Sequence, residues 1–137
     1  MSKLVQIVLR WLPVLLVMLV IFLVSSKPSS ALPNFDWADQ LIKKGGHMIG
    51  YALLALSYWR ALSFRQGKWW LAWGFALLYA VTDEFHQSFV PGRHPSVWDV
   101  LVFDNFGALI SLWLVRLYKT QRPDSPGPIV ESANVKN

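Results

Sequence analysis

The chain has 137 residues, of which 54% are hydrophobic and 15% charged, and it carries no cysteine and a net charge of +5. This length fits one small domain, and this hydrophobicity excludes an intrinsically disordered chain. Without cysteine, a disulfide scaffold, a thiolate metal site and a thiol nucleophile are excluded too. The hydrophobic residues form long blocks with single basic residues beside them, which is typical of a membrane protein. We therefore expect no nucleic-acid partner.

The first block, LVQIVLRWLPVLLVMLVIFLV at residues 4–24, has the roughly 20 apolar residues that cross a bilayer core. Arg10 lies near its start, from where it can snorkel to the headgroups. A cleaved signal peptide is the alternative, since the start is basic and residues 29–31 are small. The run is long for a signal, and Lys27-Pro28 is a poor approach to a cleavage site, so we favour a span.

Residues 25–46 predict a loop that contains a short interfacial helix, DWADQLIKK at residues 36–44. Asp36 can cap this helix, and its apolar residues can lie in the membrane interface while its charges face water. Gly45-Gly46 is expected to end or bend it.

Three further blocks follow, at residues 47–64, 69–90 and 97–118. Residues 119–137 are polar and rich in proline and serine, which predicts a disordered tail. We therefore expect an all-α fold, an integral membrane bundle of four transmembrane helices with a short interfacial helix after the first span. Residues 1–118 would form the membrane domain, and residues 119–137 a cytoplasmic tail.

The orientation of the bundle follows from the lysines and arginines beside each span. With four spans, the N-terminus, the loop at residues 60–68 and the C-terminus share one side, which carries eight of these residues against four on the other. The bias predicts a multi-pass protein of the cell membrane with both termini in the cytoplasm.

Polar residues collect at the opposite, outer end of the predicted spans. They come from the start of span two, the last third of span three, the following turn and the start of span four; they are His47, Asp83, Glu84, His86, Gln87, Arg93, His94, Asp99 and Asp104. A charged side chain within a span is costly, so these groups should face partners or a ligand. Asp83, His86 and Gln87 share one helix face.

The turn VPGRHPSVWD between the last two spans contains a tight Pro-Gly turn and a capping-box pattern, in which Ser96 would cap span four and Asp99 would reach back. We expect Arg93 to pair with Asp83, Glu84 or Asp99 over the end of span three. Asp99 and Asp104 are five residues apart, so they do not share a face of an ideal α-helix unless a π-bulge intervenes.

The stretches KKGGHMIGYALLAL and DEFHQSFVPGRHPSVWDV, followed by DNFGALIS, resemble the VanZ-like family of small membrane proteins over residues 36–117. The matching residues are Lys44, His47, Tyr51, Asp83, Glu84, Gln87, Pro91, Gly92, Arg93, Asp99 and Gly107. Gly50 departs from the pattern, because many members carry Glu there. The stretch between Asp99 and Gly107 is one residue longer than usual, which leaves open whether Asp104 or Asn105 takes the family's second polar position.

The resemblance implies a cell-envelope protein connected with resistance to the glycopeptide teicoplanin, and it implies no settled activity. We predict an outer-leaflet polar pocket formed by His47, Asp83, Glu84, Gln87, Arg93 and Asp99. Its partner would be a membrane lipid, a cell-wall precursor, a glycopeptide or another membrane protein.

An enzyme is the alternative, although we favour a binding protein. A small intramembrane acid–base enzyme would use Glu84, Asp83 and His86 on a lipid-linked envelope substrate. No nucleophile elbow is present, and the histidines lack helical metal-ligand spacing, so we predict no metal and no cofactor. Four spans also give a transporter little room for alternating access.

Overall fold

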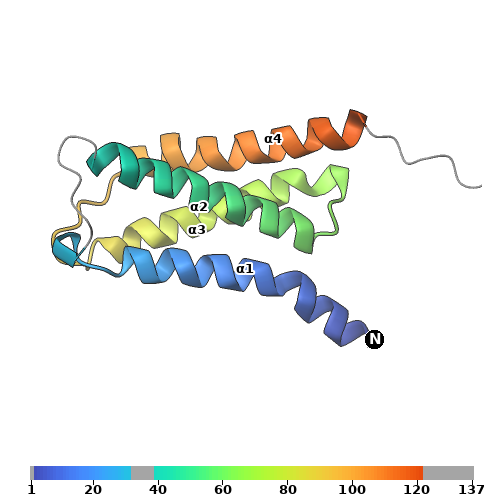
Figure 1. Cartoon of the computed structure of the whole chain (residues 1–137), viewed down its shortest axis with the longest axis horizontal. Coiled ribbons are helices and arrows are strands. Elements are labelled where there is room, and N and C mark those ends of the chain that lie inside the picture. Colours follow the sequence, from blue (N-terminus) through green and yellow to red (C-terminus); the bar gives the residue numbers. More distant parts are fainter. Residues whose placement is uncertain (1, 32–38, 122–137) are drawn as a thin grey trace, which may run out of the picture.

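The computed structural model describes residues 2–31 and 39–121, which form helices and turns without any strand (Figure 1). The elements in chain order are α1 (Lys3–Ser25), the 3-10 turn η1 (Ser29–Ala31), α2 (Asp39–Ala61), the 3-10 turn η3 (Gln66–Lys68), α3 (Trp69–Gln87), the π-helical segment η4 (Asp99–Asp104) and α4 (Asn105–Gln121). The predicted all-α class with four long helices is confirmed for this part of the chain.

The four long helices alternate in direction, so the start of α1 and the end of α4 lie at the same end of the bundle (Figure 1). Helix α2 packs against each of the other three helices and is the centre of the bundle. The N-terminal part of α1 bends away from the other helices in Figure 1. Pro13 lies inside α1, and proline in a helix interior commonly causes such a bend.

Small residues bring the helices close together. Ala72, Ala76 and Ala80 recur every four residues along α3 and are buried. On α4, a Cβ at Gly107 would overlap the carbonyl oxygen of Met48 on α2. Contacts through small residues are the usual way in which membrane helices pack, because large apolar side chains gain little by leaving lipid.

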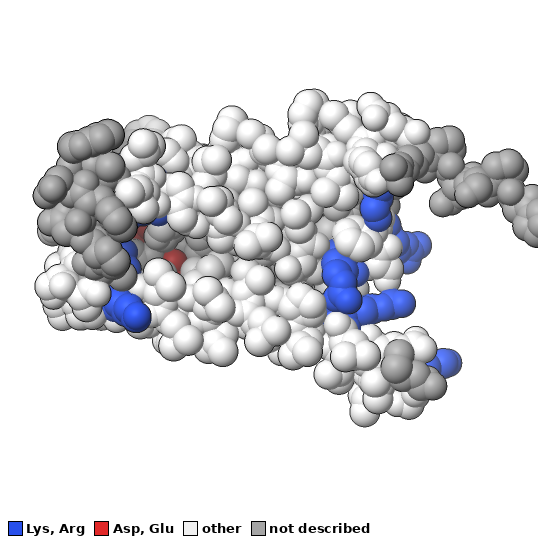
Figure 2. Space-filling model, in the orientation of Figure 1, with Lys and Arg blue, Asp and Glu red and all other residues white. Residues whose placement is uncertain are grey.

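The exterior of the bundle is apolar. Leu15, Leu78 and Phe85 are 60–69% exposed, and every long helix carries further exposed large hydrophobic residues. Figure 2 shows an uncharged band between two charged ends. Within the described residues, two stretches, Lys3–Ser25 and Asp99–Gln121, are long and apolar enough to cross a membrane. Soluble monomeric proteins rarely expose an apolar surface of this extent. Four membrane crossings stay a prediction.

The predicted interfacial helix and second span are one continuous helix, so the prediction that a helix ends at Gly45-Gly46 is wrong. Helix α2 begins at Asp39 and runs through both glycines to Ala61. Glycine lowers helix stability by only about 0.5–1 kcal/mol relative to alanine, and Lys44, beside the glycines, forms an ion pair with Asp99. Residues 36–38 of the predicted interfacial helix lie outside the described residues.

The ends of the other helices differ from prediction by a few residues. Helix α1 covers the first block almost as predicted, and α3 ends at Gln87 rather than Val90. The helical turns of the fourth block begin at Val97, and α4 continues to Gln121. Residues 119–121 are therefore helical, and the rest of the predicted tail lies outside the described residues.

Candidate functional site

The polar residues of the predicted pocket lie at one end of the bundle, where α1 and α3 end and α2 and η4 begin (Figure 1). The opposite end carries a concentration of basic side chains, visible in blue in Figure 2. The sequence therefore brings the ionisable residues of three separate segments to the same level of the bundle.

Asp83 is buried at 4% exposure and is held by three donors. Its Oδ2 accepts hydrogen bonds from Ser25 Oγ (2.9 Å), Tyr51 OH (3.3 Å) and Gln87 Nε2 (2.9 Å). Its Oδ1 has no hydrogen-bond partner among the described residues. Asp83 thus ties α1, α2 and α3 together from inside the bundle rather than standing on the wall of a pocket.

Glu84, the next residue, contacts the turn between α3 and η4 instead of α1. Its Oε2 accepts a hydrogen bond of 2.9 Å from the backbone N–H of Ser96. In a capping box, the acid three residues inside the same helix makes this bond. Glu84 takes that place from a different helix, while Asp99 forms an ion pair of 3.3 Å with Lys44. The predicted back-bond from Asp99 to Ser96 is therefore replaced by two contacts between elements.

His47 and Asp104 form a pair on the inner side of the same region. His47 Nδ1 lies 3.5 Å from Asp104 Oδ1, and Asp104 is only 2% exposed. Both carboxylate oxygens of Asp104 are buried, and neither accepts a hydrogen bond from the described residues. The π-helical segment runs from Asp99 to Asp104, and its i→i+5 repeat lets residues five apart face the same side. Both carboxylates can then face α2.

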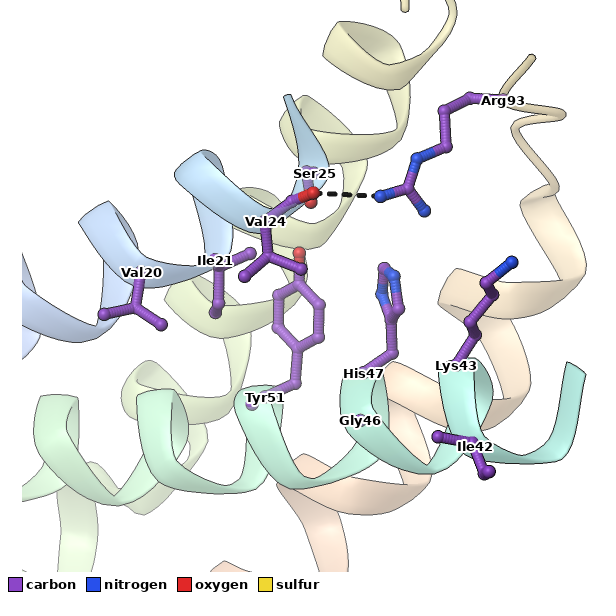
Figure 3. Close-up of a pocket in the computed structure, with 11 residues that line it drawn as sticks. Val20, Ile21, Val24, Ser25, Ile42, Lys43, Gly46, His47, Tyr51 and Arg93 are labelled. Atoms are coloured by element: carbon purple, nitrogen blue, oxygen red, sulfur yellow. Dashed lines mark hydrogen bonds between the residues drawn. The ribbon is translucent and has the colours of Figure 1, made fainter. Parts of the chain in front are cut away.

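Arg93 does not pair with the carboxylates as predicted. Its Nη2 donates to the carbonyl oxygen of Val24 (2.9 Å), and its Nε donates to that of Lys27 (3.2 Å). Figure 3 shows the side chain reaching from the turn after α3 to the end of α1. The guanidinium adds a charged donor to these carbonyls and complements the negative end of the dipole of α1.

His86 also turns to α1, away from the other proposed catalytic residues. Its Nε2 lies 2.9 Å from Ser26 Oγ, and its ring packs on Phe22 with 4.7 Å between centroids. Asp83 is buried and is held by donors at Oδ2, and Glu84 contacts the turn before η4. The structure therefore does not gather Glu84, Asp83 and His86 around one reactive position.

Two cavities adjoin these groups. The first, which we call the polar pocket, has a volume of about 350 Å³. Its described lining residues are Ser29, Lys43, Lys44, His47, Glu84, Gln87, Gly92, Arg93, His94, Ser96, Asp99 and Phe103. Five of the six predicted binding residues line it. The sixth, Asp83, lies behind the wall and holds Gln87 in place.

The second cavity, which we call the apolar cavity, lies between α1 and α2 and measures about 330 Å³ (Figure 3). Val20, Ile21 and Val24 of α1 face Ile42, Gly46, Gly50 and Tyr51 of α2 across it, with Ser25, Lys43, His47 and Arg93 at its polar edge. Lys43, His47 and Arg93 line both cavities. Both volumes lie within the range of about 300–1,000 Å³ of ligand pockets.

No group of three or more potential metal ligands lies together in the described part of the chain. Three serines that were not predicted as site residues join the end of α1 to α3 and to the turn after it: Ser25, Ser26 and Ser29. Serines at a helix end carry no signal of their own in a sequence. Asp104 belongs to the predicted group of outer polar residues. Its pairing with His47 could not be predicted, because that pairing depends on the π-helical geometry.

Comparison with protein families matches residues 8–119 to VanZ/LLP1. The chain belongs to the VanZ/LLP1 family. The match extends the resemblance from residues 36–117 to include most of α1, the helix that closes the apolar cavity and supplies Ser25 to Asp83. Searches of curated proteins and of solved structures find no match.

Proposed function

We propose that this VanZ/LLP1 family member is a multi-pass envelope protein of the cell membrane, with both termini in the cytoplasm. Its polar pocket would bind the polar part of an envelope molecule at the outer leaflet: a lipid headgroup, a cell-wall precursor or a glycopeptide. The observation that carries this proposal is the polar pocket itself, lined from α2, α3, the turn after α3 and η4. A structural tie between helix ends would not require a cavity of about 350 Å³ among charged side chains.

The charges of the pocket support a ligand of mixed polarity. Three cationic side chains, Lys43, Lys44 and Arg93, and two carboxylates, Glu84 and Asp99, line it. Most of these groups already contact protein atoms, which fixes their positions before a ligand arrives. Preorganised groups lower the entropy cost of binding.

Retention of phospholipid by the purified protein tests the binding proposal. We expect native mass spectrometry in mild detergent to show bound phosphatidylethanolamine, and Glu84→Gln and Asp99→Asn to weaken its binding about fivefold or more. Lys68→Gln, which removes a charge at the opposite end of the bundle, is the control. Equal binding by the wild type and both pocket variants would overturn the proposal.

Teicoplanin susceptibility tests the process. If the protein acts in glycopeptide resistance, its expression should raise the inhibitory concentration of teicoplanin, and Asp99→Asn should abolish the increase at equal protein abundance. Unaltered susceptibility on expression would remove glycopeptide resistance from the proposal while leaving ligand binding to the lipid experiment.

A small acid–base enzyme is the second candidate, and His47 with Asp104 is the observation in its favour. A carboxylate behind an imidazole fixes its tautomer and stabilises its protonated form, and His47 also lines the polar pocket. This pair replaces the trio of Glu84, Asp83 and His86 as the place to look for catalysis. An enzyme would lose turnover in Asp104→Asn yet retain ligand, whereas a binding protein would show no turnover in either form.

A further inference from the structure

We propose that the polar pocket and the apolar cavity are two halves of one site, and that this site holds a zwitterionic phospholipid. The phosphate and ammonium of the headgroup would occupy the polar pocket, and one acyl chain would occupy the apolar cavity between α1 and α2. This inference rests on the proposed headgroup binding and adds the class of ligand and the place of its chain.

The first argument is the shared wall. Lys43, His47 and Arg93 line both cavities, so one side of these side chains faces the polar pocket and the other faces the apolar cavity. A ligand that passes these residues meets charges on one side and aliphatic side chains on the other. An amphiphile matches that change of polarity, whereas a wholly polar or wholly apolar ligand matches only one half.

The second argument is the chemistry of each half. Val20, Ile21, Val24 and Ile42 offer aliphatic surface to a chain, and each buried methylene contributes roughly 0.8 kcal/mol. In the polar pocket, lysine and arginine suit a phosphate. Glu84 and Asp99 suit an ammonium group, because a carboxylate can accept about four hydrogen bonds and keeps capacity beyond its present partners.

The third argument is the missing side chain at Gly46. Gly46 lines the apolar cavity, and no heavy atom lies within 4 Å of the position where its Cβ would stand. Because Gly46 lines the cavity, we expect a longer side chain there to extend into it. Gly45 has the same open surroundings and lines neither cavity. The two neighbouring glycines form a matched pair for an experiment.

The experiment measures binding of dioleoyl and dihexanoyl phosphatidylethanolamine to the full chain by native mass spectrometry. We expect the wild type to prefer the long-chain lipid and Gly46→Leu to bind it about tenfold more weakly. Excluding two methylenes from the cavity is sufficient for a loss of that size. Gly45→Leu should behave as the wild type, because it changes helix propensity in the same way without filling the cavity.

Lys44→Gln separates this inference from the function on which it rests. Lys44 lines the polar pocket alone, so its loss should weaken both lipids equally. If Lys44→Gln weakens both while Gly46→Leu and Gly45→Leu match the wild type, the headgroup site stands and the chain site is overturned. If Lys44→Gln changes neither lipid, the proposed headgroup binding fails and the joint site fails with it.

A second substitution covers the case in which Gly46→Leu does not fold. Val20 lines the apolar cavity from α1 and is 59% exposed, whereas Leu19 beside it is 51% exposed and lines neither cavity. Val20→Phe should reduce the preference for the long chain, and Leu19→Phe should not. Equal effects of the two, or tighter binding of undecaprenyl phosphate than of the phospholipid, would overturn the inference.

Discussion

Asp83 is a buried carboxylate that lies between three helices and away from water. Ser25, Tyr51 and Gln87 direct donors at one of its oxygens. Burial of a carboxylate is tolerable only when such partners are in place. The charge therefore fixes how α1, α2 and α3 meet, and it positions Gln87 on the wall of the polar pocket.

Asp83→Ala should destabilise the fold by about 1–3 kcal/mol, because the buried donors of Ser25, Tyr51 and Gln87 would lose their shared acceptor. Thermal unfolding in one detergent measures the change. Thr82→Val is the control, since the Thr82 hydroxyl bonds within its own helix to Tyr79 and is exposed. Equal unfolding midpoints for the two variants would refute the role given to Asp83.

Gly107 sets the distance between α2 and α4. In an ordinary helical position, glycine to alanine is stabilising by roughly 0.5–1 kcal/mol. At Gly107 the added carbon would overlap the backbone of Met48, which cannot move without shifting α2.

Gly107→Ala should therefore lower the stability by about 1–3 kcal/mol, the usual cost of overpacking. Gly74→Ala provides the comparison, because no heavy atom lies within 4 Å of a Cβ at Gly74. Chemical denaturation should show opposite signs for the two variants. A stabilised Gly107→Ala protein would contradict the close packing of α2 on α4.

At the scale of the elements, Arg93 joins the turn after α3 to the end of α1. Its two donors reach two carbonyl oxygens, those of Val24 and Lys27. The turn that presents Arg93 depends on Gly92, whose φ of +71° is a left-handed conformation that side chains disfavour. The Pro-Gly-Arg turn thus connects the end of α3 to the end of α1 through hydrogen bonds.

Arg93→Ala should destabilise the protein by about 1–3 kcal/mol, as expected for hydrogen bonds from a charged donor. Arg93→Lys should recover only part of this, because one ammonium cannot reproduce the planar fork. Thermal unfolding of both variants is the measurement, with Lys3→Ala at the exposed start of α1 as the control. Full recovery with lysine would show that charge alone matters.

The sequence predicts the helices, because a long apolar block satisfies its backbone hydrogen bonds in a membrane by folding as a helix. It also placed the polar residues at one end, since depth along a helix follows from counting residues. It could not give the partners of those residues, which depend on how helices rotate against one another. Arg93 binds carbonyls, and Asp83 binds a serine, although electrostatics alone favoured pairing them.

Local geometry explains the remaining differences. The sequence predicts that Gly45-Gly46 ends or bends the helix. Helix α2 continues through both glycines, because contacts across the bundle outweigh their weak helix propensity. The extra residue between Asp99 and Gly107 was visible in the sequence, and the structure shows a π-helical segment there. An inserted residue in an otherwise regular span is a signal for such a segment.

At the scale of the whole molecule, the bundle has a polar end, an apolar belt and a basic end (Figure 2). The VanZ/LLP1 family match covers residues 8–119 and therefore nearly the whole of the described bundle. Four membrane crossings with the basic end in the cytoplasm stay a prediction, which rests on the bias of basic residues. A headgroup or precursor could then reach the polar pocket sideways from the outer leaflet.

Cysteine labelling on intact cells tests this account most directly, because the proposed ligands all lie at the outer face. The chain has no cysteine, so single substitutions give clean sites. His94→Cys lies at the polar end and Gly67→Cys at the basic end. We predict that a membrane-impermeant maleimide labels His94→Cys in intact cells and labels Gly67→Cys only after permeabilisation. Labelling of Gly67→Cys from outside, with none at His94→Cys, would contradict the account.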